Sequence, residues 1–286
     1  MRLKGRNIVV TGGSVGIGLA VSKKIASEGG TVIMMARDKD NLLKATNLLN
    51  TTYGKIHKTK HHHFVGDVSS IPDVEVFAIW AEQFGPIHGI VNCAGVYGPI
   101  GKTTEINTND FLDTIKINLM GTIYMCSAFH DSFSNDYKKK IINFAGGGAA
   151  NTFPNYSAYA TSKVALVRFT ENLAIELENE NYEVNCIAPG FVATRIHQKT
   201  LKIGASAAGE TFYENTKKQL ESGATPPEKA ADLTAFLLSD DSNGITGKFI
   251  SAPWDNWEDK EFQELLKTDK DFATIRRIDN KTYFKK

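Results

Sequence analysis

A tyrosine and a lysine four residues apart, Tyr159 and Lys163 in the segment Tyr-Ala-Thr-Ser-Lys, form the pair with the clearest chemistry in this sequence. Residues i and i+4 share one face of a helix, so the Lys163 ammonium is expected near the Tyr159 phenol, where it would favour the ionised form. A tyrosine tuned in this way exchanges protons near neutral pH. The pair therefore predicts an acid–base site, although alone it would often be a chance pair of surface neighbours.

A glycine-rich turn near the N-terminus, Thr-Gly-Gly-Ser-Val-Gly-Ile-Gly, follows a buried-type strand and opens a helix. Glycine permits positive φ and lets the backbone approach a pyrophosphate, which then meets the free N–H groups at the helix start. A plain tight turn is the alternative. The residues predicted to bind the cofactor here are Thr11, Gly12, Ser14, Gly16, Ile17 and Gly18.

Two further segments stand where predicted strands end. Small or polar residues at these ends leave room for a ligand across the sheet. The residues predicted to contact a dinucleotide there are Asp67, Val68, Asn92, Ala94 and Gly95.

Arg37 predicts which dinucleotide binds. An acidic residue at the end of the second strand would accept hydrogen bonds from an unmodified ribose, but this chain has Ala36 there, followed by Arg37. A guanidinium is a planar, permanently charged fork that suits a 2′-phosphate, so we expect NADP rather than NAD as the cofactor. The alternative is a solvated side chain paired with Asp38 or Asp40.

The composition limits the class of partner. The chain has 286 residues, 42% of them hydrophobic, which suits one large α/β domain. A net charge of +1 gives no reason to expect nucleic acid or a membrane as the main partner, so a small-molecule substrate is expected. Three cysteines without metal-site spacing fit reduced structural thiols, and no apolar run approaches a membrane span, so we expect a cytoplasmic protein.

Runs rich in Val and Ile alternate with longer stretches of helical period. This alternation predicts a doubly wound, mostly parallel, seven-stranded sheet with helices on both faces, in a single Rossmann-like domain. Two long helices are expected at 110–133 and 157–178, of which the second carries Tyr159 and Lys163. The predicted strands are 7–10, 31–35, 63–65, 87–92, 140–144, 183–187 and 248–251.

The domain plan places residues 1–252 in one dinucleotide-binding catalytic unit and 253–286 in a C-terminal extension on it. Small and polar residues at 201–225 predict a mobile lid. Trp254 and Trp257 either border the pocket or, as we favour, anchor the tail. The run His61-His62-His63 is not expected to bind metal, because neighbouring strand residues point to opposite faces and no further ligand is near.

Together these segments resemble the compact branch of the short-chain dehydrogenase/reductase family over about Arg6 to Ala252. The matching pieces are the turn Thr11 to Gly18, Asp67, Asn92 to Gly95, Asn118, Tyr159 to Lys163 and Pro189 to Thr194. The resemblance implies a nicotinamide cofactor, hydride transfer to or from a carbonyl or alcohol, and a homodimer or homotetramer.

By the same resemblance, Tyr159 is the general acid in reduction, and Lys163 is its electrostatic partner and a ligand of the nicotinamide ribose. Asn118 matches an asparagine at a helix irregularity that holds a water for proton relay, though an Asn among apolar residues can simply satisfy buried backbone. Pro189, Gly190 and Thr194 match the loop that orients the carboxamide.

One position departs from the family. A serine usually stands thirteen residues before the tyrosine, where this chain has Gly146. Its hydroxyl would donate to the substrate oxygen. Backbone N–H groups of Gly146 to Gly148 are the favoured replacement. Thr152, a substrate hydroxyl or Ser157 are alternatives, although Ser157 is expected to cap its helix. The remaining alternative is a protein that binds cofactor without turnover.

The sequence thus predicts an NADP-dependent oxidoreductase acting on a small polar carbonyl or alcohol, with a sugar or sugar nucleotide favoured over a hydrophobic ketone or an acyl-thioester. The rival hypothesis is a non-catalytic NADP-binding sensor or structural subunit, signalling through closure of residues 201–225.

Overall fold

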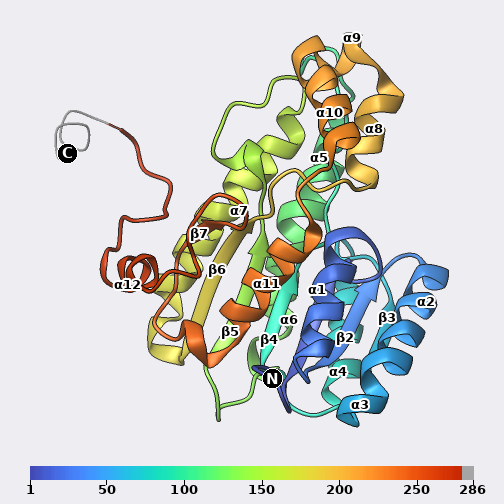
Figure 1. Cartoon of the computed structure of the whole chain (residues 1–286). Helices are drawn as coiled ribbons and strands as arrows, with labels where there is room; N and C mark the ends of the chain where they lie inside the picture. Colours follow the sequence, from blue (N-terminus) through green and yellow to red (C-terminus); the bar gives the residue numbers. More distant parts are fainter. Residues whose placement is uncertain (279–286) are drawn as a thin grey trace.

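The computed structural model describes residues 1–278 of the chain. Seven parallel strands form one sheet, as predicted, and their order is β3-β2-β1-β4-β5-β6-β7 (Figure 1). Each predicted strand is present within about two residues of its expected ends. The strands are β1 Asn7–Thr11, β2 Thr31–Ala36, β3 His62–Val65, β4 Gly89–Asn92, β5 Lys139–Phe144, β6 Tyr182–Ala188 and β7 Phe249–Ser251.

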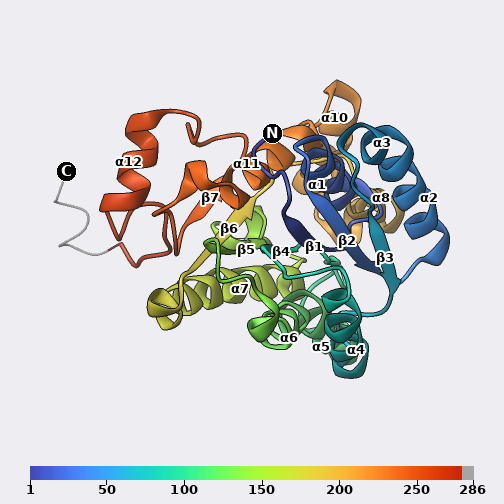
Figure 2. The ribbon, with the colours of Figure 1, turned by 90° about the horizontal axis from the view of Figure 1, so that it is seen from below.

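Helices cover both faces of this sheet, as Figure 2 shows from below. One face packs against α1 Gly16–Ser27, α2 Lys39–Leu49 and α11 Pro227–Leu238, and the other against α4 Ile71–Glu82, α6 Gly121–Ala128 and α7 Ser157–Glu176. Two apolar cores result, one on each side of the strands. Among the described residues, no helix is both long enough and apolar enough to cross a membrane.

The long helical segment expected at 110–133 is present without interruption over 108–128, but it contains a π-helical turn and ends earlier than expected. It consists of α5 Thr108–Ile115, a π-helical segment Lys116–Met120, α6, and a short 3₁₀ turn His130–Ser132. The π-helical segment holds the fully buried Asn118, whose side chain pairs with backbone of another segment. An inward-facing polar anchor of this kind accounts for the widened turn, because π-bulges insert one extra residue at such sites.

The chain runs outward in both directions from the neighbouring strands β1 and β4. In such sheets, ligands bind beyond the carboxyl ends of the strands where the order reverses. Beyond these ends lie α8 Arg195–Ile203, α9 Ala205–Ala208 and α10 Glu210–Ser222 (Figure 1). The predicted lid, 201–225, is therefore largely helical, and its mobility stays a prediction.

The segment after β7 folds back onto the same sheet. It contains α12 Lys260–Thr268, and Trp257 is buried with its Nε1 donating to Ala252 O at 3.2 Å. Further along, the Phe249 N–H donates to Ala273 O at 2.7 Å, and Lys248 Nζ donates to Asp269 O at 2.6 Å. The outer side of the last strand is therefore covered by the chain's own later residues.

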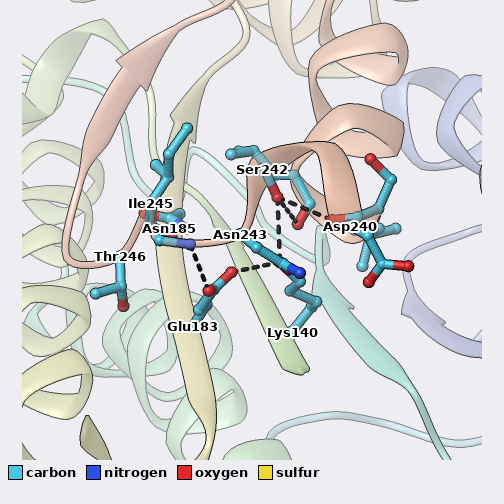
Figure 3. Close-up of polar contacts among 12 residues, drawn as sticks. Lys140, Glu183, Asn185, Asp240, Ser242, Asn243, Ile245 and Thr246 are labelled. Atoms are coloured by element: carbon cyan, nitrogen blue, oxygen red, sulfur yellow. Dashed lines mark hydrogen bonds and ion pairs between the residues drawn. The ribbon is translucent and has the colours of Figure 1, made fainter. Parts of the chain in front are cut away.

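A buried ion pair lies near the amino ends of β5 and β6, far along the strands from their carboxyl ends (Figure 3). Lys140 Nζ pairs with Glu183 and also donates to Asn243 Oδ1 at 2.9 Å and Ser242 Oγ at 3.2 Å. Glu183 accepts from the Gly244 N–H at 2.7 Å. The cluster ties two strands to the turn that follows α11.

The remaining short elements are α3 Lys55–His57, which follows a π-helical turn at Asn50–Gly54, and 3₁₀ turns at Gly147–Ala149, Glu178–Glu180 and Asp240–Ser242.

Candidate functional site

The turn between β1 and α1 is shaped by its glycines. Gly12 and Gly16 have φ of +66° and +55°, in the left-handed region that L side chains rarely adopt. A Cβ on Gly18 would lie 2.2 Å from the carbonyl oxygen of Gly12, so only glycine lets the helix pack this closely on the turn. The first residues of α1 receive no side-chain cap, since Val15 stands at the N-cap. Their N–H groups face the ligand side uncapped, as an anion site requires.

A cleft of about 840 Å³ opens over this turn. It extends from the turn past the end of β2 to the loops after β3, β4 and β6. Most of the residues predicted to bind the cofactor line it. They are Gly12, Ser14, Gly16, Ile17, Gly18, Arg37, Asp67, Val68, Ala94, Gly95 and Thr194.

Thr11 and Asn92 do not line this cleft but support its floor. Thr11 Oγ1 accepts from the N–H groups of Cys93 and Ala94, at 3.1 and 3.2 Å, and so holds the loop after β4 against the end of β1. Asn92 is buried between strands, where its Nδ2 donates to Asn143 Oδ1 at 3.0 Å. Both residues position the loop that the cleft uses.

Asn118 has the same kind of role. Its Nδ2 donates to Val96 O and its Oδ1 accepts from Val96 N–H, each at 2.8 Å, and its Nδ2 also donates to Ser162 Oγ at 2.9 Å. The side chain thus clamps the loop after β4 onto α7. The sequence left open that Asn118 simply pairs with a buried backbone group, and this is the arrangement found here. A role of Asn118 in holding a water for proton relay stays a prediction.

Arg37 projects into the cleft from the end of β2 with 61% of its side chain exposed. Neither Asp38 nor Asp40 pairs with it; Asp38 instead caps α2 by accepting from the Asn41 N–H at 2.9 Å. The partner is Asp67 across the cleft, with a separation of 3.6 Å between Arg37 Nη1 and Asp67 Oδ2. An exposed pair of this length holds the guanidinium only weakly, so it can turn to a ligand phosphate.

A second cavity of about 670 Å³ adjoins the cleft. Residues that line both include Ile17, Gly95, Tyr97, Thr194 and Ile196, so the two spaces meet. Tyr159, Lys163, Pro189 and Gly190 line the second cavity. The structure therefore brings the acid–base pair and the glycine turn, separated by more than a hundred residues in the sequence, to neighbouring spaces.

The ionisation of this pair differs from the expectation. Burial raises the pKa of Tyr159, and burial lowers the pKa of Lys163 to about 8. Lys163 Nζ lies 5.9 Å from the centre of the Tyr159 ring and donates to Phe144 O at 2.6 Å. The prediction of an acidified phenol was wrong for this structure, because desolvation of the phenol outweighs the nearby ammonium. A protonated phenol in the cavity is a proton donor.

Gly146 lies directly against this phenol. A Cβ on Gly146 would sit 2.2 Å from Tyr159 Oη, although its extended backbone, with φ of 167°, would accept any residue. The hydroxyl of Tyr159 thus occupies the space that a side chain at 146 would need. A Cβ on Gly147 would meet nothing within 4 Å. Sequence spacing identified the missing serine but gave no sign of this contact.

Ser157 and Thr152, the two side chains considered as replacements for the missing serine hydroxyl, differ in position. Ser157 does not cap α7, so that prediction was wrong: Tyr156 is the N-cap residue, and Ser157 Oγ accepts from Thr103 Oγ1 at 2.6 Å. Thr152 lines the second cavity.

Aromatic rings form much of the second cavity, a feature that sequence reasoning missed. Trp254, 80% exposed, is part of this wall, whereas Trp257 anchors the tail, so the two tryptophans divide the two predicted roles. Several of these aromatic residues directly follow strand ends in the sequence, and that position could have identified them as candidate pocket residues. The other lining residues with Phe or Tyr rings, besides Tyr159, are Tyr97, Phe144, Phe153, Phe191, Phe212 and Phe249.

The histidine run near β3 is committed to packing. His61 Nδ1 accepts from the Val32 N–H, His62 stacks on Phe84 with ring centres 3.6 Å apart, and His63 Nδ1 contacts Thr46 Oγ1. Within residues 1–278 no group of three His, Cys, Asp or Glu side chains is arranged to hold a metal ion.

Comparison with known proteins agrees with this geometry. The family model for short chain dehydrogenases matches residues 6–202. L-2,3-butanediol dehydrogenase of Corynebacterium glutamicum is 30% identical over 251 residues, covering 85% of this chain and 95% of that protein. Dehydrogenase/reductase SDR family member 4 of Caenorhabditis elegans is 28% identical, covering 87% and 94%.

Among solved structures, NAD+-bound xylitol dehydrogenase superposes with a TM-score of 0.79 at 24% identity, covering 88% of this chain and 98% of that one. The L-sorbose reductase of Gluconobacter frateurii, complexed with NADPH and L-sorbose, gives 0.77 at 23% identity, covering 88% and 96%. At this identity the likeness is one of fold.

Proposed function

Because the chain belongs to the short-chain dehydrogenase/reductase family, we propose that its two adjoining cavities form one NADP-dependent site for reduction of a carbonyl or oxidation of an alcohol. The family membership makes the protein an NAD(P)-dependent oxidoreductase of CH–OH or C=O groups. The observation that carries the proposal is the meeting of the glycine-turn cleft with the cavity that holds Tyr159.

The residues of the cleft fit a dinucleotide. The uncapped start of α1 and the positive-φ glycines would hold the phosphates, and the loop held by Thr11 would pass beneath the nicotinamide half. When bound, the nicotinamide supplies or accepts the hydride. Pro189 and Gly190 line the second cavity and Thr194 lines both, and these residues would orient its carboxamide, as in the family.

The chain's own residues would move the proton. Tyr159, kept protonated by burial, would donate to the carbonyl oxygen during reduction and accept from the alcohol in the reverse direction. Lys163, whose Nζ donates to Phe144 O, would remain largely charged at neutral pH. Its positive charge would stabilise the phenolate that forms when Tyr159 gives up its proton. Backbone N–H groups of the glycine triplet border the same cavity and would support the substrate oxygen.

Replacement of Tyr159 tests the reaction. Tyr159→Phe keeps the ring and removes the proton, so kcat for NADPH-dependent carbonyl reduction should fall roughly 10²- to 10⁴-fold while NADPH affinity stays about the same. Stopped-flow or steady-state NADPH oxidation measures kcat, and fluorescence titration measures NADPH affinity. Undiminished turnover in this variant would remove Tyr159 from the proposal, and wild-type binding without turnover on any carbonyl would favour a sensor.

Arg37 supports NADP over NAD. Its side chain reaches the cleft from the end of β2, where Ala36 stands in place of the acidic residue that would bind an unmodified ribose. Arg37→Asp should lower the ratio of kcat/KM for NADPH to that for NADH by about 10- to 100-fold, because a charge-assisted hydrogen bond to the 2′-phosphate is lost. The matched control Lys44→Asp makes the same charge change on the exposed side of α2 and should leave the ratio alone.

Similar proteins are named butanediol dehydrogenase, levodione reductase and L-sorbose reductase, and these names support a small alcohol or carbonyl compound as the substrate of this chain. The polar, sugar-like substrate favoured from the sequence is supported only by the names of these similar proteins.

A further inference from the structure

The chain after α12 turns back and fastens to α7, the helix that carries Tyr159. Glu171 on α7 is 5% exposed and accepts from the Ile275 N–H at 2.8 Å and from Arg276 Nη1 at 3.3 Å. Arg168, one turn away on the same helix, pairs with Glu171 and donates to Ile275 O at 2.8 Å. Because side chains of one helix bind both the N–H and the carbonyl of Ile275, this residue has a defined position on α7.

Ala273 attaches the same segment to the sheet. Its carbonyl oxygen accepts from the Phe249 N–H at 2.7 Å, and its φ of +53° lies in the left-handed region that residues with a side chain rarely adopt. Such a conformation persists only where the surrounding structure enforces it. Phe249 lines the second cavity. The C-terminal extension therefore binds the backbone of one residue in the wall of that cavity.

Ile275 also packs behind the loop that borders the reacting groups. It lies against an apolar cluster of four buried residues, Ala145, Ala149, Val167 and Cys186. The two alanines of this cluster enclose the glycine triplet in the sequence. Gly146 of the triplet lies against Tyr159 Oη, and Phe144 O, just before it, accepts from Lys163 Nζ. Residues 144–149 thus contact the acid–base pair and also belong to the cluster that Ile275 covers.

The glycine triplet has no side chains of its own with which to pack. Glycine has more backbone freedom than any other residue, so the position of the triplet depends on what holds its two ends. At each end that support is an alanine of the cluster, Ala145 or Ala149. A residue that packs on this cluster can therefore influence where the triplet meets the phenol.

We propose that Ile275 is a positioning residue for the reaction: by packing on the cluster that contains Ala145 and Ala149, it holds the glycine triplet against the hydroxyl of Tyr159. The C-terminal extension then contributes to the rate from behind the loop, since among the described residues none after Asp255 lines the second cavity. This inference rests on the proposed function, because it concerns the placement of the same proton donor.

The test compares two matched substitutions in the full-length protein. Ile275→Ala removes the packed side chain, and Ile278→Ala makes the same change later in the segment, where the side chain is 77% exposed. With NADPH and diacetyl or L-sorbose as carbonyl probes, kcat should fall about threefold to tenfold in Ile275→Ala, because a misplaced proton donor slows the reaction. In Ile278→Ala it should change by less than about twofold.

The two kinetic constants and a conservative variant distinguish positioning from binding. In Ile275→Ala, the KM for the carbonyl probe and the affinity for NADPH should stay within about twofold of wild type, because neither ligand touches Ile275. Ile275→Val keeps most of the apolar contact and should restore kcat to within about twofold of wild type.

A double-mutant cycle and amide exchange test the link to the triplet. Gly146→Ala already displaces the phenol, so adding Ile275→Ala should lower kcat by less than about twofold further. The Ala149 and Ala150 N–H groups donate to Gly146 O and Gly147 O. In mass spectrometry, the peptide with these amides should exchange hydrogen at least about threefold faster in Ile275→Ala than in Ile278→Ala.

Two kinetic results would overturn the proposal. One is a kcat for Ile275→Ala no lower than that for Ile278→Ala, with thermal unfolding showing both variants folded. The other is a double variant in which the separate losses of Ile275→Ala and Gly146→Ala multiply in full. If wild type reduces neither probe, that result bears on the proposed function alone, and amide exchange decides the present inference: equal rates in the two variants reject the role of Ile275.

Discussion

The hydroxyl of Tyr159 rests where a side chain at position 146 would stand. Burial keeps that hydroxyl protonated, and the neighbouring ammonium of Lys163 is engaged by the carbonyl of Phe144. Glycine at 146 therefore does more than omit a donor: it fixes where the phenol lies. Placement of a proton donor within a fraction of an ångström matters to rate, because reacting atoms must meet in a narrow range of geometry.

A pair of alanine substitutions in the glycine triplet tests this placement. Gly146→Ala puts a methyl group 2.2 Å from Tyr159 Oη and must displace the phenol, so kcat/KM should fall roughly tenfold to hundredfold. Gly147→Ala meets nothing within 4 Å and should change kcat/KM by less than about twofold. Steady-state kinetics on both variants give the comparison. Equal effects at the two positions would contradict the assigned contact.

Sequence spacing predicted which residues lie at the site better than it predicted the direction in which their side chains point. The glycine turn, Arg37 and Tyr159 line the adjoining spaces as expected. Thr11 and Asn118 turn inward because their polar atoms pair with backbone of the loop after β4, and a one-dimensional motif does not show which way a side chain points. The raised pKa of Tyr159 likewise depends on burial, which only the packed structure reveals.

Among elements, the strands were predictable because most are short apolar runs with Val or Ile between turn residues, although β3 has two histidines and a single Val. The π-helical turn between α5 and α6 could not be predicted from local sequence, since the residues around it have ordinary helical character and only the remote loop at Val96 explains it. The resemblance did imply an irregular helix at Asn118. Elements whose geometry depends on partners distant in the sequence cannot be predicted from local sequence patterns.

The buried ion pair Lys140–Glu183 links β5 and β6 outside the backbone ladder. Glu183→Gln would leave the Lys140 ammonium buried without its counter-charge, so unfolding free energy should fall by about 3–5 kcal/mol. The double variant Lys140→Met with Glu183→Leu should recover most of that loss, because two apolar groups need no partner. Urea unfolding measures both.

The two variants should leave cofactor affinity unchanged, since the pair lies near the amino ends of the strands and the site lies at their carboxyl ends. A single variant as stable as wild type would show that the ammonium finds another partner, and a double variant less stable than the single one would contradict the apolar substitution argument.

For the whole molecule, stability should depend on pH through buried histidine. His61 is 1% exposed, and burial lowers its pKa from 6.5 to about 4. Below pH 6.5 the unfolded chain binds a proton that the folded protein refuses until about pH 4. Unfolding free energy should therefore decrease as pH falls through this window, by up to about 1.4 kcal/mol per pH unit.

Urea unfolding at pH 7.5, 6.5 and 5.5 measures this slope, and His61→Gln, which retains an acceptor for the Val32 N–H, should reduce it. Parallel curves for wild type and the variant across that range would assign the slope to other groups. Oligomeric state, expected from the resemblance to be a dimer or tetramer, is to be measured by light scattering in the same buffers.

The return of the chain over β7 has a consequence for behaviour at high concentration. A terminal strand with bare amide and carbonyl groups is a template on which another molecule can add a strand and begin to aggregate. Here Ala273 already accepts from Phe249, and Lys248 holds the covering segment by two carbonyls. We expect proteolytic nicking between Asp269 and Ala273 to expose that template and to promote aggregation.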